Sequence, residues 1–246
     1  MTKTIKTGKK ILPGLSTLPR SDWKSNVASI EKLGLEEIAI FPTFIEIEER
    51  KQLYSALEKT PLKKIPHVHL RDDMEPWELE YFIKRYQAEV FNIHPWPGFK
   101  RLFEKCPQYK KMTFVENLDT LSDDFFKMLE DGYGGICLDA SHYEDAGRLQ
   151  GEPSYEKFEE CLSDYPIGCC HISGVKDEMY EYSVTNPEGI VYKEKLYGSH
   201  YVDELSELNY VKKYLKYLPP IVSIELENSF EYQLKVKEYL EKMINE

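Results

Sequence analysis

Residues 112–142 read MTFVENLDTLSDDFFKMLEDGYGGICLDASH, and they contain one strand–helix–strand unit. The apolar run Met112–Val115 has the length of a buried strand, and Gly135–Leu138 is a second such run. Between them, Ser122–Leu129 is expected to form a helix. A unit of this kind predicts two parallel strands with a covering helix.

The same alternation recurs along the 246 residues, with strands starting at intervals of roughly 25 residues. Further strands are expected at Lys10–Leu15, Glu37–Phe41, Ile65–Leu70, Glu89–Ile93, Gly168–Ile172 and Ile221–Leu226. Further helices are expected at Asp22–Leu33, Glu46–Glu58, Glu75–Tyr86, Ser154–Leu162, Asp203–Tyr217 and Phe230–Ile244. Eight strands predict an α/β fold, a (β/α)8 TIM barrel with a parallel eight-stranded barrel, built as a single domain over residues 1–246.

One connection departs from this alternation of strands and helices. The segment from Gly174 to His200 is expected to be a long loop, and long loops in compact domains tend to be functional.

Composition narrows the class of protein. The net charge of −11 counts against general nucleic-acid binding, and no apolar run is long enough for a membrane helix. The cysteine count is five, which is odd, and no secretory signal is evident, so a reducing, cytoplasmic setting is expected. Homo-oligomerisation stays open.

Histidines and carboxylates gather at the expected strand ends. Five of the six histidines lie at such an end or a few residues beyond it: His67, His69, His94, His142 and His171. The sixth, His200, ends the long segment. Strand-end carboxylates are Glu116, Asp139, Glu225 and Glu227. Buried carboxylates repel one another unless a positive charge joins them, so this pattern predicts a divalent metal site at the C-terminal face of the barrel.

Some alternatives stay open. Any one of these histidines taken alone is more often a hydrogen-bonded structural residue than a ligand, and His67 could lie behind the ligands rather than among them. Glu225 and Glu227 share a strand face, and Glu225 is preferred because it directly follows the apolar run.

These residues resemble the xylose isomerase-like TIM-barrel superfamily, which includes sugar isomerases, sugar epimerases and endonuclease IV. The most specific segment is GICLDASH at 135–142, followed by Ala146–Gly147, which is similar to the group's Asp-x-x-His element. The pair Glu116–Asn117 resembles its strand-five Glu-Asn, and His94–Pro95 resembles the His-Pro of endonuclease IV. His69, His171 and Glu225 match single positions of the group.

The resemblance implies a shared metal bound by Glu116, Asp139, His171 and Glu225. It implies a second metal at His69 and His94, bridged by Glu116, and a third at His142 and His200 in an endonuclease-like protein. In an isomerase, His142 contacts substrate instead. The chain departs from both subfamilies: Gly198 replaces an Asp of endonuclease IV, and no Arg follows His171 as in ketose 3-epimerases.

Three functions are therefore considered. The first is a divalent-metal-dependent isomerase or epimerase of a small sugar-like or polyhydroxy substrate, with Glu116 and Glu225 as catalytic base and acid. Substrate contacts are expected from His142, Lys176 and Trp96. The second is an endonuclease IV-like multi-metal phosphoesterase, and the third a non-catalytic barrel that keeps a ligand site. One to three ions of Zn or Mn are expected.

Overall fold

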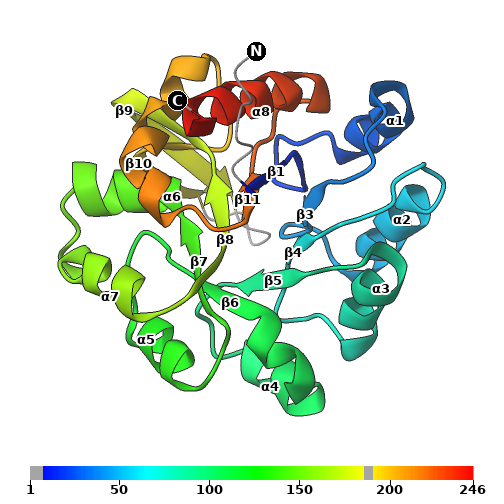
Figure 1. Cartoon of the computed structure of the whole chain (residues 1–246), viewed down its shortest axis with the longest axis horizontal. Helices are drawn as coiled ribbons and strands as arrows, with labels where there is room; N and C mark the ends of the chain where they lie inside the picture. The colour runs from blue at the N-terminus through cyan, green and yellow to red at the C-terminus, as the bar shows by residue number, and fades with distance from the viewer. Residues whose placement is uncertain (1–7, 186–190, 246) are drawn as a thin grey trace.

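Parallel strands form a nearly closed barrel at the centre of the molecule, and helices surround it (Figure 1). The computed structural model describes residues 8–185 and 191–245. In the order of the sheet, the strands are β1 (Lys10–Leu12), β11 (Ile221–Ile224), β8 (Ile167–Ile172), β7 (Gly135–Asp139), β6 (Thr113–Glu116), β5 (Val90–Ile93), β4 (His67–His69), β3 (Ala39–Phe41) and β2 (Gly14–Ser16). The prediction of a TIM barrel is confirmed.

The first strand position is divided in two. β1 pairs with β11 and β2 pairs with β3, so the segment from Lys10 to Ser16 joins the two sides of the barrel. Pro13 separates the two pieces, since it has no N–H to donate to a ladder. Gly14 is required for the close approach, because a Cβ there would lie 2.0 Å from the carbonyl oxygen of Ile224. The single strand expected over Lys10–Leu15 is therefore two short strands that occupy one position.

The helices cover the outside of the strands. The α-helices are α1 (Trp23–Leu33), α2 (Ile47–Leu57), α3 (Pro76–Tyr86), α4 (Phe99–Lys105), α5 (Asp123–Glu130), α6 (Ala140–His142), α7 (Phe158–Asp164) and α8 (Phe230–Asn245). The 3-10 helices are η1 (Pro107–Met112), η3 (Pro153–Tyr155) and η4 (Leu205–Tyr217), and η2 (Tyr143–Leu149) is a π-helix. No described helix is long and apolar enough to cross a membrane.

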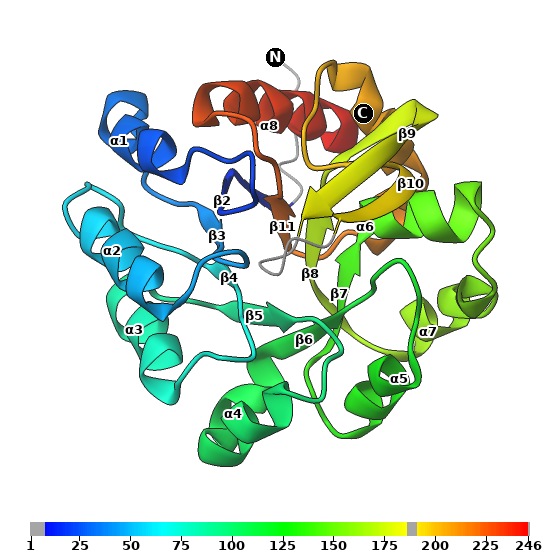
Figure 2. The ribbon, with the colours of Figure 1, turned by 180° about the vertical axis from the view of Figure 1, so that it is seen from behind.

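A β-hairpin replaces the long loop expected after β8. β9 (Gly174–Thr185) and β10 (Val191–Ser199) pair in antiparallel fashion, apart from the barrel sheet. Aromatic and polar residues alternate in YEYS at 180–183, where Tyr180 and Tyr182 are half-buried and Glu181 and Ser183 are exposed. This pattern of period two suits a strand with one face packed. In Figure 2, which shows the molecule from behind, the hairpin lies beside α6. The expectation of a loop was wrong, because this alternation was not counted as a strand signal.

The inside of the barrel holds an apolar cluster, and polar side chains lie beyond it at the C-terminal ends of the strands. A small cluster fills the lumen with the buried side chains of Leu12, Ala39, Phe41, Val90, Cys137, Cys169 and Ile221. The larger core lies between the strands and the helices. All five cysteines are free thiols. Toward the C-terminal ends of the strands, histidines and carboxylates take over, and these build the candidate site.

Candidate metal centre

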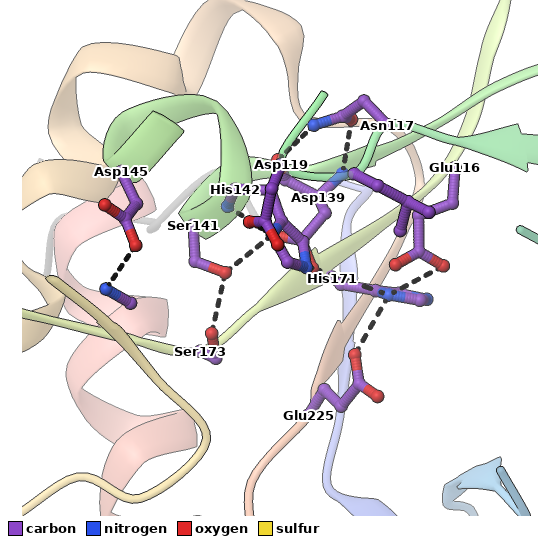
Figure 3. A network of polar contacts seen from close by, with 12 residues as sticks. Glu116, Asn117, Asp119, Asp139, Ser141, His142, Asp145, His171, Ser173 and Glu225 are labelled. Atoms are coloured by element: carbon purple, nitrogen blue, oxygen red, sulfur yellow. Dashed lines mark hydrogen bonds and ion pairs between the residues drawn. The ribbon is translucent and has the colours of Figure 1, made fainter. Parts of the chain in front are cut away.

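Four buried donors meet at the C-terminal end of the barrel. Glu116 ends β6, Asp139 ends β7, His171 lies in β8 and Glu225 directly follows β11. Because parallel strands bring their C-terminal ends to one face, these side chains converge although they span 110 positions of the sequence. One ligand atom from each lies within 4.8 Å of the others. Figure 3 shows Glu116 and Glu225 reaching toward His171.

Three carboxylates surround His171, but none of them forms a hydrogen bond with its ring nitrogens. Its Nδ1 atom lies 3.1 Å from Glu225 Oε2, 3.5 Å from Glu116 Oε2 and 3.8 Å from Asp139 Oδ2. Even so, both ring nitrogens of His171 and Asp139 Oδ2 are buried atoms without a hydrogen bond. Buried polar atoms are usually hydrogen-bonded. Nitrogen and oxygen atoms that lack a hydrogen bond and lie close together are therefore the arrangement expected of the ligand atoms of a cation.

The charges around His171 support the same interpretation. Burial lowers the pKa of an imidazolium, but the carboxylates of Glu116 and Glu225 raise the pKa of His171 well above its ordinary value. Burial likewise raises the pKa of Glu225, yet the neighbouring His171 lowers it to about 2. Without a cation, a proton on His171 therefore supplies the positive charge that the carboxylates require.

Asp139 is held so that one oxygen stays free. Its Oδ1 accepts hydrogen bonds from the Ser141 hydroxyl (2.6 Å) and from the backbone N–H of His142 (2.8 Å). Its backbone is bound on both sides by the Asn117 amide, which donates to Asp139 O and accepts from Asp139 N at 2.9 Å each. The remaining oxygen, Oδ2, faces His171 and is available as a ligand.

A second group of donors shares Glu116 with the first. His69 Nε2, at the end of β4, lies 3.2 Å from Glu116 Oε2, and His94 Nε2 lies 3.8 Å from Glu116 Oε1. The two imidazole nitrogens are themselves 3.2 Å apart. Burial lowers the pKa of His94 to about 4, so its ring is neutral near pH 7, the form that binds metals. These three residues could hold another ion beside the first.

His142 and His200 lie at the same cavity but in neither donor group. His142 Nδ1 is 2.7 Å from Asp119 Oδ1, and its Nε2 is 3.9 Å from Asp139 Oδ2. Burial lowers the pKa of His142, but Asp139 and Asp119 raise it to about 10. His200 donates from Nδ1 to the carbonyl oxygen of Glu225 at 3.1 Å. Among residues 8–185 and 191–245, no group of three donors includes either histidine, so the structure does not assemble the third metal site.

The other expected residues lie farther from the donors. Glu227 accepts from the backbone N–H of Arg20 (2.8 Å) and from its guanidinium (2.9 Å), which leaves Glu225 as the carboxylate of this strand that reaches His171. Lys176 pairs with Asp203 (2.7 Å) and Glu207 (3.2 Å), outside the cavity. The Trp96 ring meets that of His94 edge-on at 4.5 Å and is half exposed, and it is not among the residues that line the cavity.

A cavity of about 250 Å³ opens above the donors. Its floor includes Glu116 and Glu225, and its walls include His94, His142 and His200. The hairpin forms part of its lining with the side chains of Tyr180, Tyr182, Glu194 and Leu196. Arg20 is the one Lys or Arg among the described lining residues, and Glu227 already neutralises it.

Asp145 fastens the hairpin over this cavity, and the sequence did not single it out. Its Oδ2 accepts from the backbone N–H groups of Tyr197 (3.1 Å) and Gly198 (2.7 Å) at the bulge of β10. A Cβ at position 198 would lie 3.0 Å from that oxygen, so glycine permits the approach. Asp119, the partner of His142, was missed as well. A carboxylate two residues after Asn117 was its only sequence signal.

Comparisons with known proteins agree with the fold. No protein-family model matches the sequence, and no curated protein sequence matches it. Among solved structures, a truncated 3-deoxy-D-arabino-heptulosonate 7-phosphate synthase from Thermotoga maritima is similar at a TM-score of 0.50 and 12% identity, covering 96% of this chain and 86% of that chain. The fold is that of a TIM barrel. A D-tagatose 3-epimerase-like protein is similar at a TM-score of 0.47 and 17% identity, covering 95% of this chain and 97% of that chain. A likeness at 12% identity concerns the fold alone, so the reaction has to be argued from the site.

Proposed function

We propose that the protein is a divalent-metal-dependent isomerase or epimerase of a small polyhydroxy compound. The observation that carries this proposal is the approach of two buried carboxylates, Glu116 and Glu225, to one ring nitrogen of His171 at the floor of a cavity. Two carboxylates on either side of a cation can remove a proton from one face of a substrate carbon and return a proton to the other face. Proton transfer between the two faces of that carbon, or between neighbouring carbons, can use this arrangement.

The residues divide the work. A divalent cation at this site would polarise a substrate carbonyl and so acidify the adjacent C–H. One of Glu116 and Glu225 takes the proton from carbon and the other returns a proton. His142, an imidazolium whose Nδ1–H is engaged by Asp119, can donate its Nε2–H to a substrate oxygen. The hairpin covers the cavity and limits the access of water.

The cavity supports a small and uncharged substrate. Its volume of about 250 Å³ lies at the small end of ligand pockets. The pairing of Arg20 with Glu227 leaves the described lining without an unpaired Lys or Arg for a phosphate. The five free thiols fit a reducing, cytoplasmic setting.

A second candidate function is the hydrolysis of a small phosphoester. The donor group of His69, His94 and Glu116 favours it, since two ions bridged by one carboxylate are the arrangement of many phosphoesterases. The neutralised Arg20 weighs against it, and for this reason the isomerase proposal comes first.

Deuterium exchange tests the proposal. Metal-loaded protein is incubated with ketoses and polyol-derived ketones in D2O, and incorporation of deuterium at carbon is followed by NMR. The proposal expects exchange or product with at least one compound, and its loss in Glu225→Gln and in Glu116→Gln. Turnover of a phosphoester without any exchange at carbon would favour the second candidate and contradict the first.

A further inference from the structure

Beneath the donors, a chain of hydrogen bonds crosses the inside of the barrel. The Asn92 amide lies 2.6 Å from Glu116 Oε2, and its oxygen lies 3.0 Å from His67 Nε2. The other ring nitrogen of His67, Nδ1, is 2.7 Å from the hydroxyl of Ser223. The four residues come from β5, β6, β4 and β11, and all are buried. The chain therefore links opposite sides of the barrel to one carboxylate of the metal centre.

The chemistry of the groups fixes the direction of the two hydrogen bonds made by the Asn92 amide. The Glu116 carboxylate only accepts, so the Asn92 NH2 group donates to it. The Asn92 oxygen then faces His67 and accepts a hydrogen bond from Nε2–H. The ring of a neutral His67 has Nδ1 left as an acceptor, and the Ser223 hydroxyl donates to it. All three donors point toward Glu116, an arrangement in which each hydrogen bond polarises the next.

We propose that His67 and Ser223 are positioning residues for Glu116, acting through Asn92. They fix the Asn92 amide, and Asn92 fixes the rotation of the carboxylate. In that rotation, Oε2 faces His69 and His171, and Oε1 faces His94. This inference rests on the metal site proposed above. It adds that the metal affinity depends on His67 and Ser223, which belong to neither of the two donor groups that share Glu116.

A different role for His67 is less well supported. His67, Cys137 and Cys169 form another buried group whose ligand atoms lie within 4.8 Å of one another, and thiols bind soft metals. Both ring nitrogens of His67, however, are already engaged by Ser223 and Asn92. The two thiols also belong to the apolar cluster that fills the lumen. The geometry thus favours the hydrogen-bond chain over a thiolate-bound metal.

Chelator competition with Zn and Mn measures the consequence. In His67→Phe, which removes the donor and the acceptor, the dissociation constant of the metal should rise by about tenfold to a hundredfold. His67→Gln keeps an N–H and an acceptor oxygen at similar spacing, and should bind the metal as the original protein does. Thr113→Val is the matched control, because it removes a buried hydroxyl bond to Tyr109 on the strand of Glu116 and leaves the chain intact.

Several outcomes would overturn the inference. Unchanged affinity in His67→Phe would contradict it while leaving the proposed function standing. A parallel loss in Thr113→Val would show that any weakening of β6 suffices. Metal lost from Cys137→Ser or Cys169→Ser as strongly as from His67→Phe would assign His67 to the thiol group. If His67→Phe does not fold, Ser223→Ala removes one bond of the same chain, and a loss of about threefold is expected.

A measurement on the metal-free protein separates this inference from the proposed function. Nitrogen-15 NMR of the histidine rings distinguishes the two neutral tautomers and the imidazolium. The chain requires a proton on Nε2 of His67, which donates to the Asn92 oxygen. A proton on Nδ1 alone would overturn the inference whether or not the protein binds metal. Failure of the wild-type protein to bind Zn or Mn, by contrast, would contradict the proposed function first.

Discussion

The Nε2 atoms of His69 and His94 lie 3.2 Å apart, at the ends of neighbouring strands. Two ligands of one tetrahedral Zn ion, each with a bond of about 2.0 Å, are separated by roughly the same distance, ~3.3 Å. Glu116, at the end of β6, is the third member of the donor group of His69 and His94. It also belongs to the donor group around His171. The spacing therefore fits two ions that share one carboxylate.

Removal of His94 should empty one site and spare the other. In His94→Ala, the second donor group keeps only His69 and Glu116, whereas the residues around His171 are untouched. We expect the bound metal to fall from two equivalents to one, as measured by elemental analysis after dialysis against limiting Zn. Loss of both equivalents, or of neither, would contradict a shared-carboxylate pair.

Removal of the Asp145 carboxylate should loosen the hairpin. Asp145→Ala deletes the charged acceptor of two backbone N–H groups, and such hydrogen bonds contribute about 1.5–3 kcal/mol. The amides of Tyr197 and Gly198 should then exchange with deuterium about tenfold to a hundredfold faster, as followed by mass spectrometry or NMR. Glu181→Gln is the control, because it breaks only a surface pair with Lys193 on the same hairpin. Equal protection in Asp145→Ala and the original protein would show that the hairpin does not depend on this anchor.

Asp73 should stabilise the fold at neutral pH and lose that contribution in acid. Burial raises the pKa of Asp73, but hydrogen bonds from Arg71 and Arg50 outweigh it and lower the pKa below 3.8. A lowered pKa in the folded state stabilises the protein above the unfolded-state value, and the contribution disappears as the pH falls through the folded-state value.

Urea unfolding of Asp73→Asn checks this sign. The Asp73 side chain is 35% exposed, so screening by solvent limits the expected loss at pH 7 to about 1 kcal/mol. The difference between the variant and the original protein should shrink as the pH falls below about 4. Glu48→Gln, at an exposed pair with Lys51, should change little at either pH. A deficit that stays constant down to pH 3 would rule out the ionised Asp73 as its cause.

The barrel and the strand-end residues of the candidate site could be predicted from the sequence, because each of them is marked by a local pattern. A short apolar run followed at once by Glu116 or Asp139 gives both the strand and the place where it ends. Parallel strands then bring those ends together without further information. Glu225, preferred over Glu227 because it follows the apolar run, lies 3.1 Å from His171, and its role as a ligand stays a prediction.

The hairpin and the residues that depend on it were out of reach for a physical reason. Asp145, about 50 residues earlier, binds the hairpin through two backbone amides that no sequence pattern marks. Lys176 was expected at the substrate, but as part of β9 it faces Asp203 and Glu207 instead. Asp119 was missed for the same reason. Its importance comes from its contact with His142, which lies 23 residues later in the sequence.

Metal binding by the original protein and by two strand-end variants tests the proposed site most directly. Protein stripped with chelator is titrated with Zn and with Mn, and the bound metal is measured by elemental analysis. Glu116→Gln should raise the dissociation constant by at least about a hundredfold, because both donor groups lose their shared ligand. Glu227→Gln, which changes a carboxylate two residues from Glu225 that pairs with Arg20, should bind as the original protein does. No bound metal in the original protein, or equal affinity in Glu116→Gln, would contradict the proposed site.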